Sequence, residues 1–268
     1  MTDRNDGART ALQALFDREG QSPWIDFIDR DLHESGKLDE LIGKGIRGLT
    51  SNPTIFGKAV ATGQYDDLIR REIEAGDDNQ QIYEEIAVGD IQAACDHLRS
   101  VYDASGGTDG FASIEVEPAW ADDTDGTIER ARHLWARVDR PNCFVKIPAT
   151  EAGIPAVEQA ISEGINVNVT LMFSVAVYER IARAYLAGLR RRLAGGGDLR
   201  RLSSVASFFV SRVDTEADRR LVEAGRTDLQ GKLAVANAKL AYEHWQQAFS
   251  GDRWAFLEGN GARNQRCL

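Results

Sequence analysis

The stretch NCFVKIPATEAGIPAVEQAISEGINVNVTL, residues 142–171, contains two β-rich runs separated by a helical pattern. Residues 142–149 and 164–171 are rich in apolar and β-branched side chains, whereas apolar residues recur at helical spacing within 153–164. A strand, a helix and a second strand in this order indicate a parallel βαβ unit. The same order recurs along the chain, so this stretch decides the fold class.

Further β-rich runs alternate with amphipathic helical patterns, such as residues 127–138 and 175–193. The runs are SPWIDFID (22–29), GIRGLTSN (45–52), GFASIEVEP (110–118) and SVASFFVS (204–211). Repeated β-then-α order has two large solutions, the open doubly wound sheet and the closed eight-stranded barrel. A G-x-G-x-x-G turn after the first strand would favour the open nucleotide-binding form, but this chain lacks it. GGG at 195–197 follows a helical pattern, so it indicates a helix end.

We therefore expect an α/β fold of the (β/α)8 TIM-barrel type. We place one incomplete barrel domain over residues 1–268, with residues 1–20 as an N-terminal helical extension within it. The β-rich runs supply about six of the eight strands.

Composition narrows the class of protein. With 268 residues, 43% of them hydrophobic, the chain can bury a sizeable core. Its net charge of -10 argues against nucleic acid as a partner, since a basic face is the usual footprint of that function. No run approaches the ~18 apolar residues of a membrane span, and residues 1–20 lack the apolar core of a signal peptide. We expect a cytoplasmic protein that binds neither nucleic acid nor membranes.

The cysteines are three, an odd number, and they are scattered, as are the four histidines. Neither a disulfide framework nor a zinc site is indicated by this spacing. We expect no metal.

Polar side chains stand near the C-terminal ends of the expected strands. They are Asp26, Asn52, Glu115, Lys146, Asn168, Thr170, Ser207 and, just beyond the last run, Arg212. In an α/β barrel these strand ends line one mouth, where active sites of this architecture form. We therefore expect these side chains to converge on one site.

A structural alternative exists for several of them. Asp26, Asn52 and Ser207 are residue types that often cap helices or form turns. Lys146 and Glu115 could form a structural ion pair, since a buried charge in a barrel strand is costly unless it is paired. The convergence of all the polar positions favours the functional interpretation.

A lysine within an apolar strand suits imine chemistry. Desolvation disfavours the ammonium form and supplies free amine near neutral pH. A Schiff base between Lys146 and a ketose would withdraw electrons from the adjacent carbon–carbon bond, so that cleavage leaves an enamine. Asp26, Glu115 and Thr170 are residue types that general acid–base catalysis and the positioning of a water require. Asn52 and Asn168 could hold substrate hydroxyls, and Arg212 with Ser207 could grip a phosphate.

These residues lie in motifs that resemble the transaldolase family, in particular the longer transaldolases of high-GC bacteria. The motifs are SPWIDFIDRDL, GLTSNPTIF, SIEVEP, FVKIPAT, INVNVTLMFS and SFFVSRVDTEAD, in the family's order from about residue 22 onward. The resemblance implies transfer of a dihydroxyacetone unit from sedoheptulose 7-phosphate or fructose 6-phosphate to an aldose phosphate, in the non-oxidative pentose phosphate pathway. It implies no cofactor, because the lysine is the electron sink.

The resemblance also implies a role for each residue. Lys146 would form the Schiff base and Asp26 would act on the hydroxyl next to the broken bond, while Glu115 and Thr170 would manage the catalytic water. Asn52, Asn168 and Ser207 would orient sugar hydroxyls, and Arg212 would bind the phosphate.

The chain departs from the family's pattern at its C-terminal end. RCL, residues 266–268, resembles the opening of the seventh strand, and the sequence stops there. We therefore expect a truncated barrel whose open edges favour self-association. Two alternatives to an active transaldolase stay open, a catalytically silent remnant and a related lysine-dependent aldolase that acts on sugar phosphates and releases free dihydroxyacetone.

Overall fold

The computed structural model describes residues 9–267. Part of the expected N-terminal extension, residues 1–8, and the final Leu268 lie outside the described residues. The described chain forms two compact units: residues up to 115 with 137–143, and residues 116–136 with 144 onward. The single-domain boundaries expected from the sequence stay a prediction.

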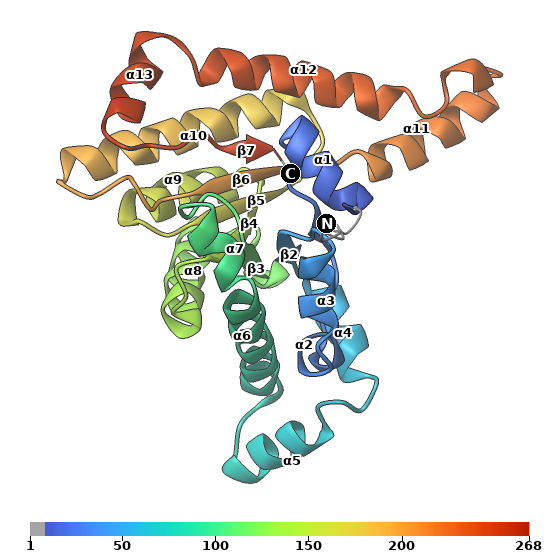
Figure 1. Ribbon diagram of the computed structural model, residues 1–268, viewed down its shortest axis with the longest axis vertical. Helices are drawn as coiled ribbons and strands as arrows, with labels where there is room; N and C mark the ends of the chain where they lie inside the picture. Colours follow the sequence, from blue (N-terminus) through green and yellow to red (C-terminus); the bar gives the residue numbers. More distant parts are fainter. Residues whose placement is uncertain (1–8, 268) are drawn as a thin grey trace, which may run out of the picture. The chain divides into compact units, whose positions relative to one another are not determined.

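The first unit contains three parallel strands in chain order. These are β1 (Trp24–Ile25), β2 (Gly48–Thr50) and β3 (Phe111–Glu115). Its helices are α1 (Ala11–Glu19), α2 (Arg30–Glu34), α3 (Lys37–Gly43), α4 (Pro53–Val60), α5 (Asp66–Ala75), α6 (Asn79–His97) and α7 (Arg99–Ala104). The long α6, dark green in Figure 1, packs against β3 and also contacts α2 and α3.

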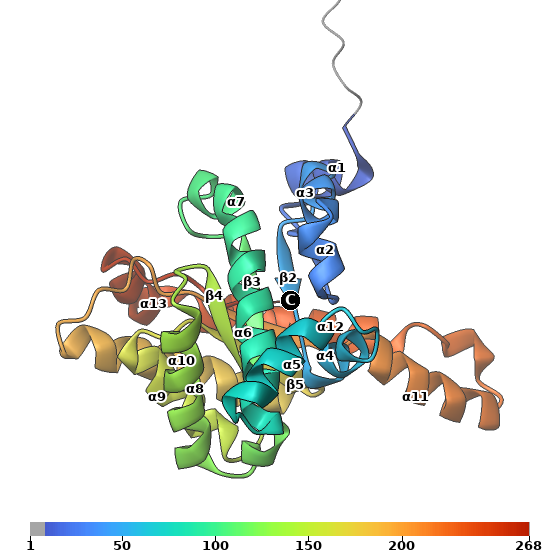
Figure 2. The ribbon, with the colours of Figure 1, turned by 90° about the horizontal axis from the view of Figure 1, so that it is seen from below.

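The second unit contains four strands, again parallel and in chain order. They are β4 (Cys143–Pro148, which begins at the unit boundary), β5 (Val167–Met172), β6 (Ser204–Phe208) and β7 (Arg266–Cys267). The helices are η1 (Pro118–Trp120), α8 (Thr124–Val138), α9 (Gly153–Glu163), α10 (Val175–Ala194), α11 (Ser211–Glu223), η2 (Thr227–Leu229), α12 (Leu233–Ala248) and α13 (Gly251–Gly259). Helices α9 and α10 pack on each other and on β5, and α12 lies along α10 (Figures 1 and 2).

The strand order confirms the predicted α/β class of the barrel type. Every predicted β-rich run contains a strand, and each pairing within a unit joins consecutive parallel strands, as in a (β/α)8 barrel. The expectation that RCL opens a seventh strand is also confirmed, because Val205 and Ala206 of β6 pair with Arg266 and Cys267.

The first strand pair depends on a glycine. Gly48 in β2 is the register partner of Trp24 in β1. A Cβ atom at Gly48 would lie only 2.2 Å from the Trp24 indole, so no larger residue fits without movement. The indole nitrogen donates to the Ser22 hydroxyl at 3.0 Å, which fixes the ring over the glycine. The start of the sheet is therefore held by a close approach between the Trp24 ring and the Gly48 backbone.

The end of β5 departs from regular strand geometry. Val169 pairs with Ala206 and Met172 pairs with Phe208, so three steps along β5 match two along β6. This is a β-bulge, and within it Leu171 has a positive φ of 60°. A leucine with positive φ is strained, which is unusual outside functional or tightly constrained sites.

Candidate active site

The predicted site residues of the second unit lie on three neighbouring strands and the turn that follows. Lys146 is in β4, Asn168 and Thr170 are in β5, and Ser207 is in β6. Lys146 pairs in register with Asn168, and Pro148 with Thr170. The structure therefore places Lys146 and Asn168 at one level of adjacent strands, with Thr170 and Ser207 nearer the C-terminal ends of β5 and β6.

Lys146 stands in a strand of six residues that are all buried. The residue is only 7% exposed. Its carbonyl accepts a hydrogen bond from the N–H of Val116 at 3.0 Å, which holds the strand backbone at this position. The predicted burial of the lysine is confirmed.

Asn168 and Ser207 are coupled across β5 and β6. The Ser207 hydroxyl donates to the side-chain oxygen of Asn168 at 2.8 Å. Asn168 is fully buried and Ser207 is half-buried. Because the bond engages the oxygen of the amide, it orients the amide nitrogen as the end that can donate. Ser207 therefore is not a helix cap, which was its structural alternative.

Thr170 is buried within the bulge of β5. The residue is 1% exposed, whereas the next residue, Leu171, is 40% exposed. Thr170 therefore faces the interior and Leu171 the solvent. Sequence reasoning found Thr170 but missed Leu171, because the irregular register appears only when two strands are paired.

Arg212 is the second residue of α11, directly after the loop that leaves β6. Its guanidinium lies 4.8 Å from the centre of the Phe209 ring, a cation–π distance. Phe209 in turn stacks on Phe173, with ring centroids 5.1 Å apart. This aromatic pair holds an exposed arginine near the strand ends of β5 and β6. Sequence reasoning missed the pair, whose only signal was its place beside two predicted site residues.

The predicted site residues of the first unit follow the ends of its three strands. Asp26 is exposed directly after β1, Asn52 comes two residues after β2, and Glu115 is the half-buried last residue of β3. The register of β2 and β3 pairs Thr50 with Ser113, so Asn52 and Glu115 each stand two residues beyond the last paired position. The C-terminal ends of these strands therefore carry the predicted carboxylates and amide.

Asn52 has the structural role that its residue type suggested. Its side-chain oxygen accepts the N–H of Ile55 at 3.0 Å and caps α4. The cap employs the amide oxygen, while the amide nitrogen is not needed for it. Asp26 does not cap a helix, since Asp29 caps α2.

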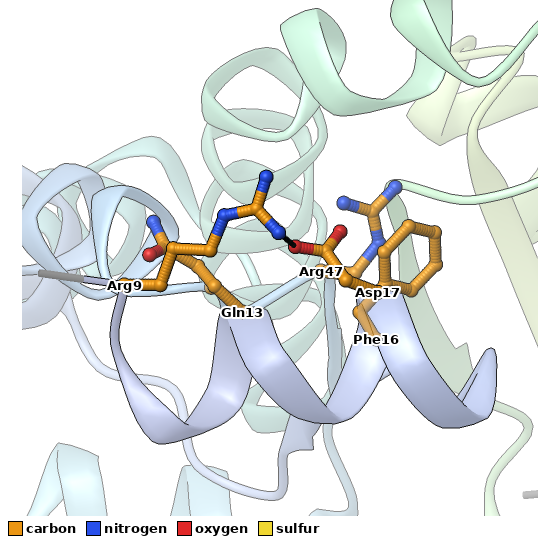
Figure 3. A pocket seen from close by; sticks show the side chains of 6 residues that line it. Arg9, Gln13, Phe16, Asp17 and Arg47 are labelled. Carbon is orange, nitrogen blue, oxygen red and sulfur yellow. Dashed lines mark ion pairs between the residues drawn. The ribbon is translucent and has the colours of Figure 1, made fainter. Parts of the chain in front are cut away.

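A cavity of about 360 Å³ opens at the other end of β2 (Figure 3). It is lined by Arg9, Gln13, Phe16, Asp17, Gly45 and Arg47. Arg9 forms an ion pair with Asp17 at 2.7 Å, and the Arg47 guanidinium lies 3.6 Å from the centre of the Phe16 ring. Arg47 also binds the buried Asp109 at 2.5 Å. Both arginines therefore have acidic partners, and the cavity lies at the strand ends opposite the candidate site.

Within residues 9–267 no group of three or more histidine, cysteine or acidic side chains is placed to hold a metal ion. In the same range, no helix has the length and apolar character required to cross a lipid bilayer.

Comparison with known proteins assigns this arrangement to a family. The family model described as "Transaldolase/Fructose-6-phosphate aldolase" matches residues 23–254. A transaldolase of Acidothermus cellulolyticus is 50% identical over 253 residues, which cover 93% of this chain and 68% of that protein. Transaldolase 1 of Streptomyces avermitilis is 48% identical, covering 96% of this chain and 69% of the relative, and transaldolase 2 of a Nostoc species is 46% identical, covering 93% and 69%. The resemblance inferred from the motifs is confirmed.

Proposed function

Because the chain belongs to the transaldolase/fructose-6-phosphate aldolase family, we propose that it is a transaldolase with Lys146 as its Schiff-base residue. The donor would be sedoheptulose 7-phosphate or fructose 6-phosphate, and the acceptor an aldose phosphate. The observation that carries the proposal is a lysine, 7% exposed, in an entirely buried strand beside the polar ends of β5 and β6.

The first step is imine formation at the ketose carbonyl. The Lys146 amine attacks this carbon, and the carbonyl oxygen leaves as water after it has gained protons. The attack requires the neutral form of the amine. Glu115 and the buried Thr170 hydroxyl would position the water and move its protons.

Cleavage of the carbon–carbon bond follows. Asp26 would remove the proton from the hydroxyl on the far side of the bond, between the third and fourth ketose carbons. The electron pair of the broken bond passes to the imine, and an aldose phosphate leaves. The remaining enamine, still bound to Lys146, attacks the aldehyde of the acceptor, and hydrolysis then frees the new ketose.

Substrate orientation would depend on the polar residues around the lysine. Asn52, Asn168 and Ser207 would bind sugar hydroxyls, and the Ser207 hydroxyl holds the Asn168 side chain in place. Arg212 would bind the phosphate, because a planar guanidinium can donate two parallel hydrogen bonds to it. This assignment places the phosphate beside α11 and the reacting carbons beside β4.

The cellular setting follows from the reaction. We propose a cytoplasmic enzyme of the non-oxidative pentose phosphate pathway, since phosphorylated sugars are its substrates. None of the three cysteines is paired in a disulfide, in keeping with a reducing compartment. Self-association through the sheet edges stays a prediction.

A coupled assay tests the proposed reaction against the aldolase alternative. Fructose 6-phosphate is supplied with and without erythrose 4-phosphate, and glyceraldehyde 3-phosphate is measured. A transaldolase releases glyceraldehyde 3-phosphate continuously only with the acceptor, and sedoheptulose 7-phosphate appears in equal amount. Continuous release without acceptor, together with free dihydroxyacetone, would identify an aldolase. No product from folded protein would identify the silent remnant.

A further inference from the structure

A buried hydrogen-bond network lies beside the loop that carries Asp26. Tyr65 is fully buried, and its hydroxyl donates to a carboxylate oxygen of Asp90 at 2.5 Å. The other oxygen of Asp90 lies 3.1 Å from Nε2 of His33. Asp90 is 4% exposed and belongs to α6, whereas His33 belongs to α2. The network therefore ties α2 to α6.

Tyr65 of this network also contributes to the cap at the start of α2. The first N–H groups of any helix lack partners within the helix. In α2 three of them have side-chain acceptors. These are the Tyr65 hydroxyl for Arg30 at 2.8 Å, the Gln64 amide oxygen for Asp31 at 2.9 Å, and the Asp29 carboxylate for Leu32 at 2.8 Å.

Two further contacts fasten the same segment. The Arg30 guanidinium donates to the carbonyl of Gln64 at 2.9 Å and lies 4.7 Å from the centre of the Tyr65 ring. The Tyr65 hydroxyl accepts from Arg30 while it donates to Asp90, so it needs its proton. Burial and the neighbouring Asp90 carboxylate raise the pKa of Tyr65 well above its ordinary value, which keeps the proton in place.

The geometry constrains Asp26 from both sides. Ile25 before it is paired in β1, and Asp29 after it begins the cap of α2. Only residues 26–28 bridge the two fixed points, and Ile28 among them is fully buried. A short span with both ends held has few conformations, so the start of α2, together with β1, limits where the Asp26 carboxylate can lie.

We infer that Tyr65, Gln64 and Asp90 are positioning residues. Together they hold the Asp26 carboxylate in the position that carbon–carbon cleavage requires. The inference rests on the proposed role of Asp26. None of the three need touch the substrate. Their effect passes through the backbone of residues 26–29.

Tyr65→Phe is the primary test, since it removes the hydroxyl and keeps the ring in its buried place. We expect kcat for transfer to fall by about tenfold, because a small misplacement of an acid–base group is costly. KM for fructose 6-phosphate should change by less than about twofold, since Lys146 and Arg212 are unaffected. Borohydride should still trap the adduct on Lys146. Gln64→Ala, which leaves the buried core intact, should also lower kcat.

Tyr185→Phe is the matched control. Tyr185 is also fully buried, and its hydroxyl donates to the carbonyl of Arg263 at 2.7 Å in the second unit. The variant removes a tyrosine hydroxyl and its hydrogen bond from a fully buried residue, so it controls for the loss of such a group away from Asp26. Its kcat should stay within about twofold of the unaltered protein.

A double-mutant cycle with Asp26→Asn distinguishes positioning from general damage. If Tyr65 acts through Asp26, Tyr65→Phe should change kcat by less than about twofold when Asp26→Asn is already present. An undiminished tenfold effect in that background would overturn the inference, as would an unchanged kcat in the single Tyr65→Phe variant. If Asp26→Asn alone leaves kcat intact, the proposed role of Asp26 fails and the inference fails with it.

Discussion

Lys146 in β4 and Asn168 in β5 are register partners on neighbouring parallel strands. Both are buried, and Asn168 is held by the Ser207 hydroxyl at 2.8 Å. The register partner of Lys146 is therefore an uncharged amide side chain that a hydrogen bond holds in place. A carboxylate in place of the Asn168 amide would add a negative charge beside Lys146.

Asn168→Asp tests this relationship with a change of nearly equal volume. The added negative charge should favour the protonated lysine, so imine formation should require higher pH. We expect the rising limb of kcat/KM against pH to move upward by about one pH unit, the scale of a nearby opposite charge. The measurement is the pH profile of fructose 6-phosphate turnover.

Asn166→Asp provides the control for that profile. Asn166 lies just before β5, at the strand end opposite the candidate site, where its side-chain oxygen accepts the N–H of Ser203 at 2.9 Å. This variant should keep the original pH profile. A similar shift in both variants would show that the register neighbour of Lys146 has no special influence.

Arg212→Ala should chiefly raise KM for phosphorylated donors. The phosphate contact is made in both the ground state and the transition state, so its loss weakens binding more than turnover. We expect KM to rise by about tenfold or more, while kcat changes by less than about threefold. Initial-rate kinetics with fructose 6-phosphate gives both values.

Arg219→Ala is the matched control on the same helix. Arg219 is exposed and engages Glu216 at 2.8 Å and Glu223 at 2.6 Å. The Arg219→Ala variant should leave KM unchanged, because it removes only exposed ion pairs, which contribute little to the stability of the protein. A collapse of kcat with constant KM in Arg212→Ala would mean that the arginine acts on the reacting carbons.

Gly48→Ala should destabilise the protein through the contact with Trp24. The added methyl group would lie 2.2 Å from the indole, and such overpacking costs about 1–3 kcal/mol. Urea unfolding measures the change. Gly89→Ala is the control, since Gly89 is exposed within α6 and an added Cβ meets nothing within 4 Å. That variant should gain about 0.5–1 kcal/mol from better helix propensity, and equal losses in both would refute the steric account.

The sequence was sufficient to predict the order of the strands and to single out polar residues along them and after their ends. Lys146 was conspicuous because burial of a charged group within an apolar strand costs free energy unless the charge is paired or neutralised. The sequence left two roles open for Asn52, a helix cap and a substrate contact. The structure shows that its side-chain oxygen caps α4. The bulge at Leu171 is a property of two paired strands, so neither strand alone could predict it. The Tyr65–Asp90 hydrogen bond joins residues 25 positions apart, so no local sequence pattern predicts it.

The central claim is that Lys146 forms the covalent intermediate. The most direct measurement is incubation with fructose 6-phosphate, reduction with borohydride, and peptide mapping by mass spectrometry. We predict one adduct, on Lys146, which is absent in Lys146→Arg because a guanidinium stays protonated and cannot attack a carbonyl. Lys239→Arg, a change on α12, should leave the adduct in place. Labelling of a different lysine, or no labelling of a folded sample, would contradict the account.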